Sequence, residues 1–376
     1  MAGRNPDRFL YCRRRHRLHT FSSPKSIWKV IFLLALASLM LAACSGVAVN
    51  NWPGLSHAGN AVYYAQLQLI KIDATNGTQI WRYPEKPDAK NSFIAAPAVN
   101  GRQVIAGNMN NEVIAIDDES GQELWAFRDE QGKGRFIASP LVVNDTVLIP
   151  STDRYLYSLD ANTGQLLWRF KARDALWAGV ASDGKWVYLP GTDHYLYVID
   201  LASGKLAWEM DLGGSMLHAP VLAPDGMLYL STIVQEMIAV DAAQQKVVWR
   251  ETIEGKVWNP PLLDDGRLVF GTDKNKVYAL DAQSGATLWT VSTTGSIIAS
   301  PVKLGDGYLL GAENGEVFIV TREGARGWTR TLKGKIYSSL SLSENLAAVG
   351  GMELEHLLVT FDAQGKQDWT YNPPGN

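Results

Sequence analysis

Few residues in this sequence have the types and spacing that catalytic or metal chemistry requires. Four histidines lie beyond residue 43, and no short, regular interval separates them: His57, His194, His218 and His356. Metal sites usually take their ligands from short, regular spacings, and a nucleophile needs a base and an orienting group close to it. The sequence shows neither arrangement, so we expect no metal centre and no catalytic residues.

Acidic residues recur in four turns, and carboxylate oxygens are the ligands that calcium prefers. The four are Asp153, Asp193, Asp273 and Glu313. Each occupies the same place in its copy of a repeated unit, and capping of the turn by the side chain would explain all of them at once. We therefore expect turns rather than calcium loops, and no bound cofactor.

The two cysteines, Cys12 and Cys44, both precede the main body of the chain and cannot give it a disulfide framework. Cys44 ends the tetrapeptide Leu41-Ala42-Ala43-Cys44, which follows a basic stretch and fourteen uncharged residues (30–43). This pattern resembles a bacterial lipobox, whose cysteine thiol is acylated. We expect residues 1–43 to be a signal peptide that is removed, Cys44 to be lipidated, and residues 44–50 to form a tether. The alternative is an uncleaved tilted helix with Cys44 as a buried thiol.

Charge is distributed unevenly along the chain. Residues 1–43 carry eight Lys and Arg against one acid, Asp7, which leaves 27 basic and 37 acidic residues in the remainder. A body this acidic is repelled by phosphate backbones, so we expect no nucleic-acid binding. With the lipobox, this predicts an extracytoplasmic location on the cell envelope, at the outer membrane if the organism has one.

A unit of about 40 residues recurs eight times after residue 50. Its most regular copies are VYALDAQSGATLW (277–289), LYSLDANTGQLLW (156–168) and LYVIDLASGKLAW (196–208). An aspartate starts the turn of the unit in six copies: Asp73, Asp117, Asp160, Asp200, Asp241 and Asp281. A tryptophan follows eight residues later: Trp81, Trp125, Trp168, Trp208, Trp249 and Trp289. Two degenerate copies, around Thr321 and Asp362, complete the set.

This period fits four short strands and leaves no room for a crossover helix. The alternating LYxID segment predicts a strand with a buried face, and the aspartate and the glycine that follows it predict a tight turn. The recurring tryptophan is large enough to fill the wedge between neighbouring blades. We therefore predict an all-β fold, a single eight-bladed propeller of four-stranded blades over residues 51–376.

The repeated unit resembles that of quinoprotein-type propellers, the superfamily that contains the pyrroloquinoline-quinone alcohol dehydrogenases. The combination of lipobox, length and eight blades without added domains is similar to outer-membrane protein assembly lipoproteins. For the dehydrogenases, the resemblance implies a vicinal cysteine pair, a calcium-binding Glu/Asn/Asp set and a catalytic aspartate. The propeller region contains no cysteine. We therefore favour a non-catalytic scaffold.

Large residues also occur near the start of each predicted innermost strand. We assign six of them to a candidate partner-binding rim around the central channel: Phe93, Phe136, Trp177, His218, Trp258 and Tyr337. Packing between the blades is the alternative for these side chains.

The sequence therefore predicts a monomeric lipoprotein that binds protein partners in the cell envelope and meets the membrane through its anchor. Envelope protein assembly is the favoured task. Two alternatives stay open, a quinone-dependent oxidoreductase and an extracytoplasmic propeller that senses or binds a ligand.

Overall fold

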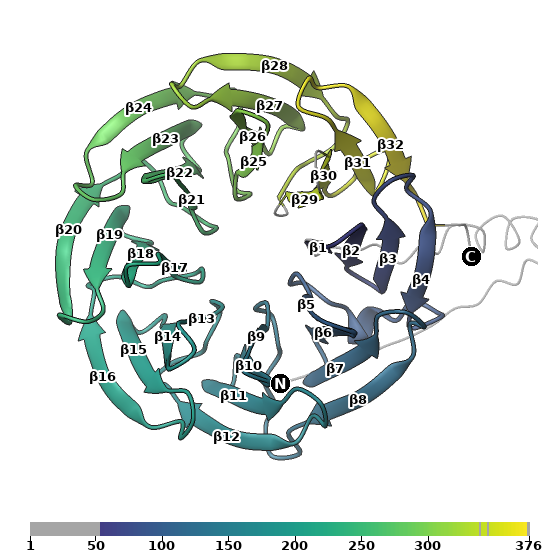
Figure 1. The fold of residues 1–376 in the computed structure, drawn as a ribbon, viewed down its shortest axis with the longest axis vertical. Coiled ribbons are helices and arrows are strands. Elements are labelled where there is room, and N and C mark those ends of the chain that lie inside the picture. The colour runs from purple at the N-terminus through teal and green to yellow at the C-terminus, as the bar shows by residue number, and fades with distance from the viewer. Residues whose placement is uncertain (1–52, 338–339, 344–345, 374–376) are drawn as a thin grey trace, which may run out of the picture. The chain divides into compact units, whose positions relative to one another are not determined.

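The strands form eight antiparallel sheets of four, arranged in a ring (Figure 1). This computed structural model describes residues 53–337, 340–343 and 346–373. Each sheet is one blade, and its four strands follow one another in sequence from the innermost to the outermost. The predicted eight-bladed, all-β propeller is confirmed.

The bounds of the strands follow the repeat. Blades 1 to 4 comprise β1 (Gly54–Ala58), β2 (Ala61–Ala65), β3 (Leu69–Asp73), β4 (Gln79–Tyr83); β5 (Ala98–Asn100), β6 (Gln103–Gly107), β7 (Glu112–Asp117), β8 (Glu123–Arg128); β9 (Leu141–Val143), β10 (Thr146–Pro150), β11 (Tyr155–Asp160), β12 (Leu166–Lys171); β13 (Ala181–Ser182), β14 (Trp186–Pro190), β15 (Tyr195–Asp200) and β16 (Leu206–Asp211). A short 3-10 helix, η1 (Ala89–Asn91), lies between blades 1 and 2.

Blades 5 to 8 comprise β17 (Val221–Leu222), β18 (Met227–Thr232), β19 (Glu236–Asp241), β20 (Lys246–Thr252); β21 (Leu262–Asp264), β22 (Arg267–Thr272), β23 (Lys276–Asp281), β24 (Thr287–Ser292); β25 (Val302–Leu304), β26 (Gly307–Gly311), β27 (Glu316–Thr321), β28 (Arg326–Thr331); β29 (Ser341–Ser343), β30 (Leu346–Gly350), β31 (Leu358–Phe361) and β32 (Gln367–Tyr371).

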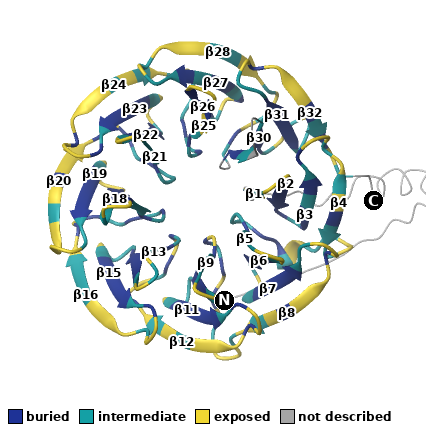
Figure 2. Ribbon diagram, in the orientation of Figure 1, coloured by how far each residue is buried: buried dark blue, intermediate teal, exposed yellow. Residues whose placement is uncertain are grey.

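The core lies between the blades. Buried apolar side chains form one cluster at each interface between neighbouring blades, including the interface between the last blade and the first. The second and third strands supply most of this core because both of their faces pack against a neighbouring blade. The outermost strands form the outer wall of the ring (Figure 2), and in β12 and β24 exposed and half-buried residues alternate.

The propeller presents two faces with different connections. Each innermost strand is entered from a loop that starts at the outermost strand of the preceding blade. These loops and the turns between second and third strands share one face, here called the entry face. The turns between first and second strands and between third and fourth strands form the opposite face, because successive strands run antiparallel.

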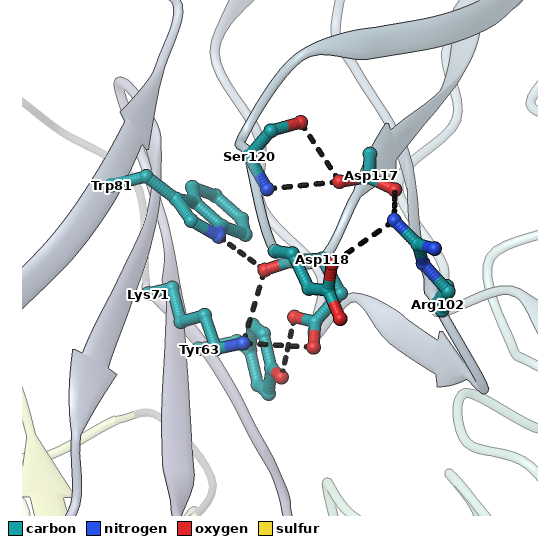
Figure 3. A network of polar contacts seen from close by, with 8 residues as sticks. Tyr63, Lys71, Trp81, Arg102, Asp117, Asp118 and Ser120 are labelled. Atoms are coloured by element: carbon teal, nitrogen blue, oxygen red, sulfur yellow. Dashed lines mark hydrogen bonds and ion pairs between the residues drawn. The ribbon is translucent and has the colours of Figure 1, made fainter.

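The repeated aspartate and tryptophan join neighbouring blades on the opposite face. Asp117 shows the aspartate's role, since its Oδ1 accepts hydrogen bonds from the backbone N–H and the hydroxyl of Ser120, both at 2.8 Å (Figure 3). These bonds lower the pKa of the Asp117 carboxyl. The Trp81 indole of the previous blade donates to the Asp118 carbonyl oxygen at 2.7 Å, next to an ion pair between Lys71 and Asp118 (Figure 3).

The same tryptophan contact recurs at seven of the eight interfaces. The indole N–H donates over 2.7–3.0 Å to a carbonyl oxygen of the next blade, in the pairs Trp81–Asp118, Trp125–Ala161, Trp168–Leu201, Trp249–Ala282, Trp289–Arg322, Trp328–Ala363 and Trp369–Ala74. The indole also lies flat against the turn glycine of that blade. A Cβ on Gly204 would come within 2.6 Å of the Trp168 ring, so this place requires glycine.

Blade 5 departs from the pattern at its turn. Gln245 occupies the glycine position with a positive φ of 53°, which is unfavourable for a residue with a Cβ. The facing indole is that of Trp208, and within the described part of the chain it makes no hydrogen bond to a carbonyl of blade 5. Gln245 is exposed, and this turn lacks the glycine against which the other seven indoles pack.

The ring closes without a strand shared between its two ends. Blade 1 consists wholly of β1–β4, and blade 8 wholly of β29–β32. Trp369 donates to the Ala74 carbonyl at 2.8 Å, and the Tyr371 hydroxyl donates to Oε1 of Gln79 at 2.6 Å. Closure therefore depends on side-chain packing and a few hydrogen bonds rather than on strand pairing.

Candidate partner-binding face

The structure brings only part of the predicted rim to the surface. Trp177 is 55% exposed, and Trp258 and Tyr337 are half-buried. Phe93, Phe136 and His218 are buried in the interior. Half of the six residues therefore pack inside the propeller and cannot contact a partner.

The reason is that the six residues belong to three different repeat positions. Phe93 and Phe136 share a position with Leu176, Met216 and Val257, all of them buried. At this position the backbone N–H donates to the turn between the second and third strands, as Leu176 does to the Ser151 carbonyl at 3.3 Å. The side chain is thereby directed inward, and that of the next residue in the extended loop points out.

The outward position carries a large apolar side chain in each of the seven blades from blade 2 to blade 8. We call these residues the entry ring: Ile94, Ile137, Trp177, Leu217, Trp258, Ile298 and Tyr337. All are half-buried except Trp177, which is exposed. The sequence contains the signal that identifies them, because each lies three residues before the proline, or its replacement Val180 or Leu340, that precedes the innermost strand.

Polar groups orient two of the aromatic rings. Nε1 of Trp258 lies 3.4 Å from Oδ2 of Asp273, and the Tyr337 hydroxyl donates to Oε1 of Glu313 at 2.5 Å. The ammonium groups of Lys256 and Lys335 lie 5.8 Å from the ring centres of Trp258 and Tyr337, respectively. Aromatic rings with fixed polar tips suit a contact surface, because they offer area at little cost in side-chain entropy.

His218 lies one position closer to the innermost strand than the entry ring, and its side chain is part of the core. Its Nδ1 lies 2.8 Å from the Ala219 carbonyl oxygen, and its Nε2 lies 2.6 Å from the Ser231 hydroxyl. Burial lowers the pKa of the ring from 6.5 to about 4. The neutral ring satisfies both of its nitrogens by donating to the carbonyl and accepting from the serine.

A turn in blade 5 carries apolar side chains that the sequence reasoning missed. Ile233 and Val234 are 38% and 52% exposed, at the place where blades 3 and 4 carry Thr152-Asp153 and Thr192-Asp193. Comparing these turns between copies would have singled out blade 5.

The channel wall contains one further candidate site. A hollow of about 480 Å³ lies between the innermost strands of blades 1, 6, 7 and 8. Leu55, Leu262 and Val302 contribute apolar walls, and His57 and Ser341 are joined there by a contact of 3.2 Å between Nδ1 and the hydroxyl. Its size falls in the range of small-ligand sites.

The residues present do not fit a quinone–calcium centre of the dehydrogenase type. The described residues include no cysteine, and within them no three His, Cys, Asp or Glu side chains are grouped so as to hold a metal ion. In the same part of the chain, no helix is long and apolar enough to cross a membrane. Cys44, the signal peptide and the tether lie outside the described residues.

Comparison with known proteins identifies the family. A family model described as "Outer membrane protein assembly factor BamB" matches residues 27–156, 152–232 and 221–339. No curated protein sequence matches the chain.

Solved structures resemble this one in fold at low sequence identity. BamB from Moraxella catarrhalis is 17% identical with a TM-score of 0.69, and the match covers 81% of this chain and 94% of that one. The computationally designed Ika8 protein is 14% identical with a TM-score of 0.71, covering 84% and 98%. A europium-containing methanol dehydrogenase is 13% identical with a TM-score of 0.69, covering 82% and 83%. This chain belongs to the PQQ-like repeat propellers of the family described as outer membrane protein assembly factor BamB.

Proposed function

We propose that this chain is a non-catalytic, lipid-anchored scaffold of the cell envelope that binds protein partners through the entry ring. The observation that carries the proposal is the recurrence of a large apolar side chain at one surface position in seven consecutive blades. The preceding residue already fills the core, and the side chains of the entry ring stay partly or fully exposed. Family membership supports a role in envelope or outer-membrane protein assembly.

The chemistry of the face supports binding over catalysis. The ring offers aliphatic and aromatic area with few fixed polar groups, which suits an extended peptide segment with apolar side chains. A reaction would need a nucleophile or a metal together with supporting groups, and the entry ring brings no such set together.

Crosslinking in intact cells, followed by capture of the propeller and mass spectrometry, tests the proposal. A Trp177→Ala/Trp258→Ala double variant should lose most of the partner that the wild type recovers. Leu167→Ala/Leu288→Ala is the matched control, because these side chains are 52% and 47% exposed on outermost strands away from the ring. Equal recovery by all three proteins would refute the role of the ring.

A ligand-binding function is the second candidate, and the hollow in the channel wall is the observation that favours it. Thermal stabilisation by a sugar or peptide, lost in a Leu262→Trp variant that fills the hollow, would support this function. Purification of the protein with a quinone chromophore and dye reduction would instead favour an oxidoreductase.

A further inference from the structure

We propose that a strip of the entry face, outside the ring opening, contacts the surface of an anionic membrane. The strip consists of Arg135, Arg154, Trp177, Ile233 and Val234. The inference goes beyond the protein-binding function, and it rests in part on the proposed lipid anchor at Cys44.

Hydrogen bonds between successive loops make the strip one continuous surface. Each loop or turn of blades 3 to 5 is tied to the next on the entry face. In order, these bonds join Arg135 to Thr152 (2.8 Å), Leu176 to Ser151 (3.3 Å), Thr192 to Ala175 (2.8 Å), Ser215 to Thr192 (2.6 Å) and Ile233 to Ser215 (2.9 Å). The side chains of the strip are therefore held on a fixed frame.

Exposure of the apolar side chains of the strip does not stabilise the folded chain. Trp177, Ile233 and Val234 are the most exposed large apolar side chains on the entry face. Exposed apolar residues on adjacent elements indicate a contact surface. Tryptophan in particular favours the boundary between water and lipid, where its ring lies in an apolar layer and its N–H stays hydrated.

The other end of the strip is cationic. Arg135 and Arg154 are exposed, and neither guanidinium has an ion-pair partner among the residues that the structure describes. Neighbouring arginines differ, since Arg169 is paired with Asp129 and Arg173 with Glu209.

Unpaired arginines are suited to lipid phosphates, and each contributes about 1 kcal/mol near an anionic membrane. Asp174 is an exposed carboxylate on the path of the strip. Asp153 and Asp193 lie in its turns, where each accepts a hydrogen bond from a tyrosine hydroxyl, that of Tyr157 and Tyr197 respectively. The unpaired cations of the strip are therefore Arg135 and Arg154, at its blade 3 end.

The described part of the chain enters the propeller on the entry face. A Cβ on Gly54 would lie 2.2 Å from the backbone of Ala95, so β1 begins beside the loop that carries Ile94. However the ten residues 44–53 are arranged, they reach at most about 36 Å. A lipid on Cys44, as proposed above, would attach the propeller through a strand that begins at the entry face.

Hydrogen–deuterium exchange on the full protein, purified from its host membrane and reconstituted in phosphatidylglycerol–phosphatidylcholine vesicles, tests the proposal. We expect slower exchange at residues 174–179 and 231–236 than in the protein free of vesicles. The equivalent loop and turn of blade 7, residues 295–300 and 311–316, lie on the same face away from the strip and serve as an internal control. Unchanged exchange in the strip, or equal protection of the control segments, would overturn the proposal.

Charge variants distinguish membrane binding through the strip from membrane attachment through the anchor. Arg135→Gln/Arg154→Gln should lower the affinity for anionic vesicles about 30-fold, the equivalent of about 2 kcal/mol for two charges. Lys205→Gln/Lys366→Gln removes the same charge from the opposite face and should change the affinity little. Equal losses in both variants would count against the strip.

The mass of the amino-terminal fragment reports the anchor independently. If it carries no lipid, the anchor is wrong, and exchange in the presence of vesicles still decides whether the strip binds. Protection that appears only with a captured protein partner, and not with lipid, would assign the strip to that partner instead.

Discussion

At the scale of single residues, His218 makes stability depend on pH. Burial lowers its pKa to about 4 in the folded protein, whereas the unfolded ring titrates near 6.5. Between these values the unfolded state binds more protons, so stability is full above pH 6.5 and falls as the pH drops toward 4. Between pH 7.5 and 5 the free energy of unfolding should decrease by about 2 kcal/mol.

Urea unfolding across this pH range measures the effect, and NMR titration of the His218 ring measures the pKa directly. His194→Gln is the control, because His194 is exposed in the turn between β14 and β15. That variant should retain the pH dependence, whereas His218→Asn should flatten it. A ring that titrates near 6.5 in the folded protein would contradict the buried, neutral assignment.

At the scale of the repeated elements, the turn of blade 5 is less stable than its counterparts in the other blades. Replacing Gln245 by Gly should stabilise the protein by about 2 kcal/mol. Relief of the positive φ contributes about 1 kcal/mol, and the restored indole hydrogen bond of Trp208 contributes about as much. The converse change, Gly285→Gln, should cost at least about 2 kcal/mol, because a Cβ there would lie 2.8 Å from the Trp249 ring.

Thermal unfolding of the two variants beside the wild type checks this pair of expectations. A Gln245→Gly protein no more stable than the wild type would show that Trp208 is held away from the turn by something other than this side chain.

The elements also show where sequence reasoning succeeds and where it fails. Fold, blade number and strand pattern follow from the repeat, because a period of about 40 residues with fixed turn and tryptophan positions admits few architectures. The partner-binding rim was predicted only in part, because large residues were chosen from each copy without aligning the copies to the same repeat position. Phe136 and Trp177 differ by one position relative to the residue that precedes the innermost strand, and in an extended segment one position reverses the direction of the side chain.

The residues at the two ends of the strip could not be predicted from residue size or from the periodicity of the sequence. Ile233 and Val234 occupy a turn outside the repeated aspartate–tryptophan motif, and the unpaired state of Arg135 and Arg154 depends on which neighbours pair with which acids. Such features appear only when loops from different blades are placed side by side.

At the scale of the whole molecule, the ring is closed by side chains alone. Since each blade consists of four consecutive strands, no strand pair among the described residues joins blade 8 to blade 1. The seam relies on Trp369 and Tyr371, and any opening of the ring can begin there without breaking a strand pair.

Two circular permutants test this account of closure. Both would join Asn372 to Pro53 with nine residues, the length of the connection between β12 and β13 (172–180). The first would be cut between Gly132 and Lys133, in a loop between blades, and would keep every sheet continuous in sequence. The second would be cut between Asn162 and Thr163, so that β12 begins the chain and pairs with β11 at its end.

Both permutants should fold, because each cut falls in a connection between strands. The second should unfold about tenfold more slowly or more, because the β11–β12 hydrogen bonds must break before its ring can open, and roughly 1.4 kcal/mol in the barrier suffices for that factor. Unfolding rates after a jump into denaturant provide the measurement. Equal rates for the two proteins would mean that closure of the ring does not limit unfolding, and that the inter-blade core alone sets the barrier.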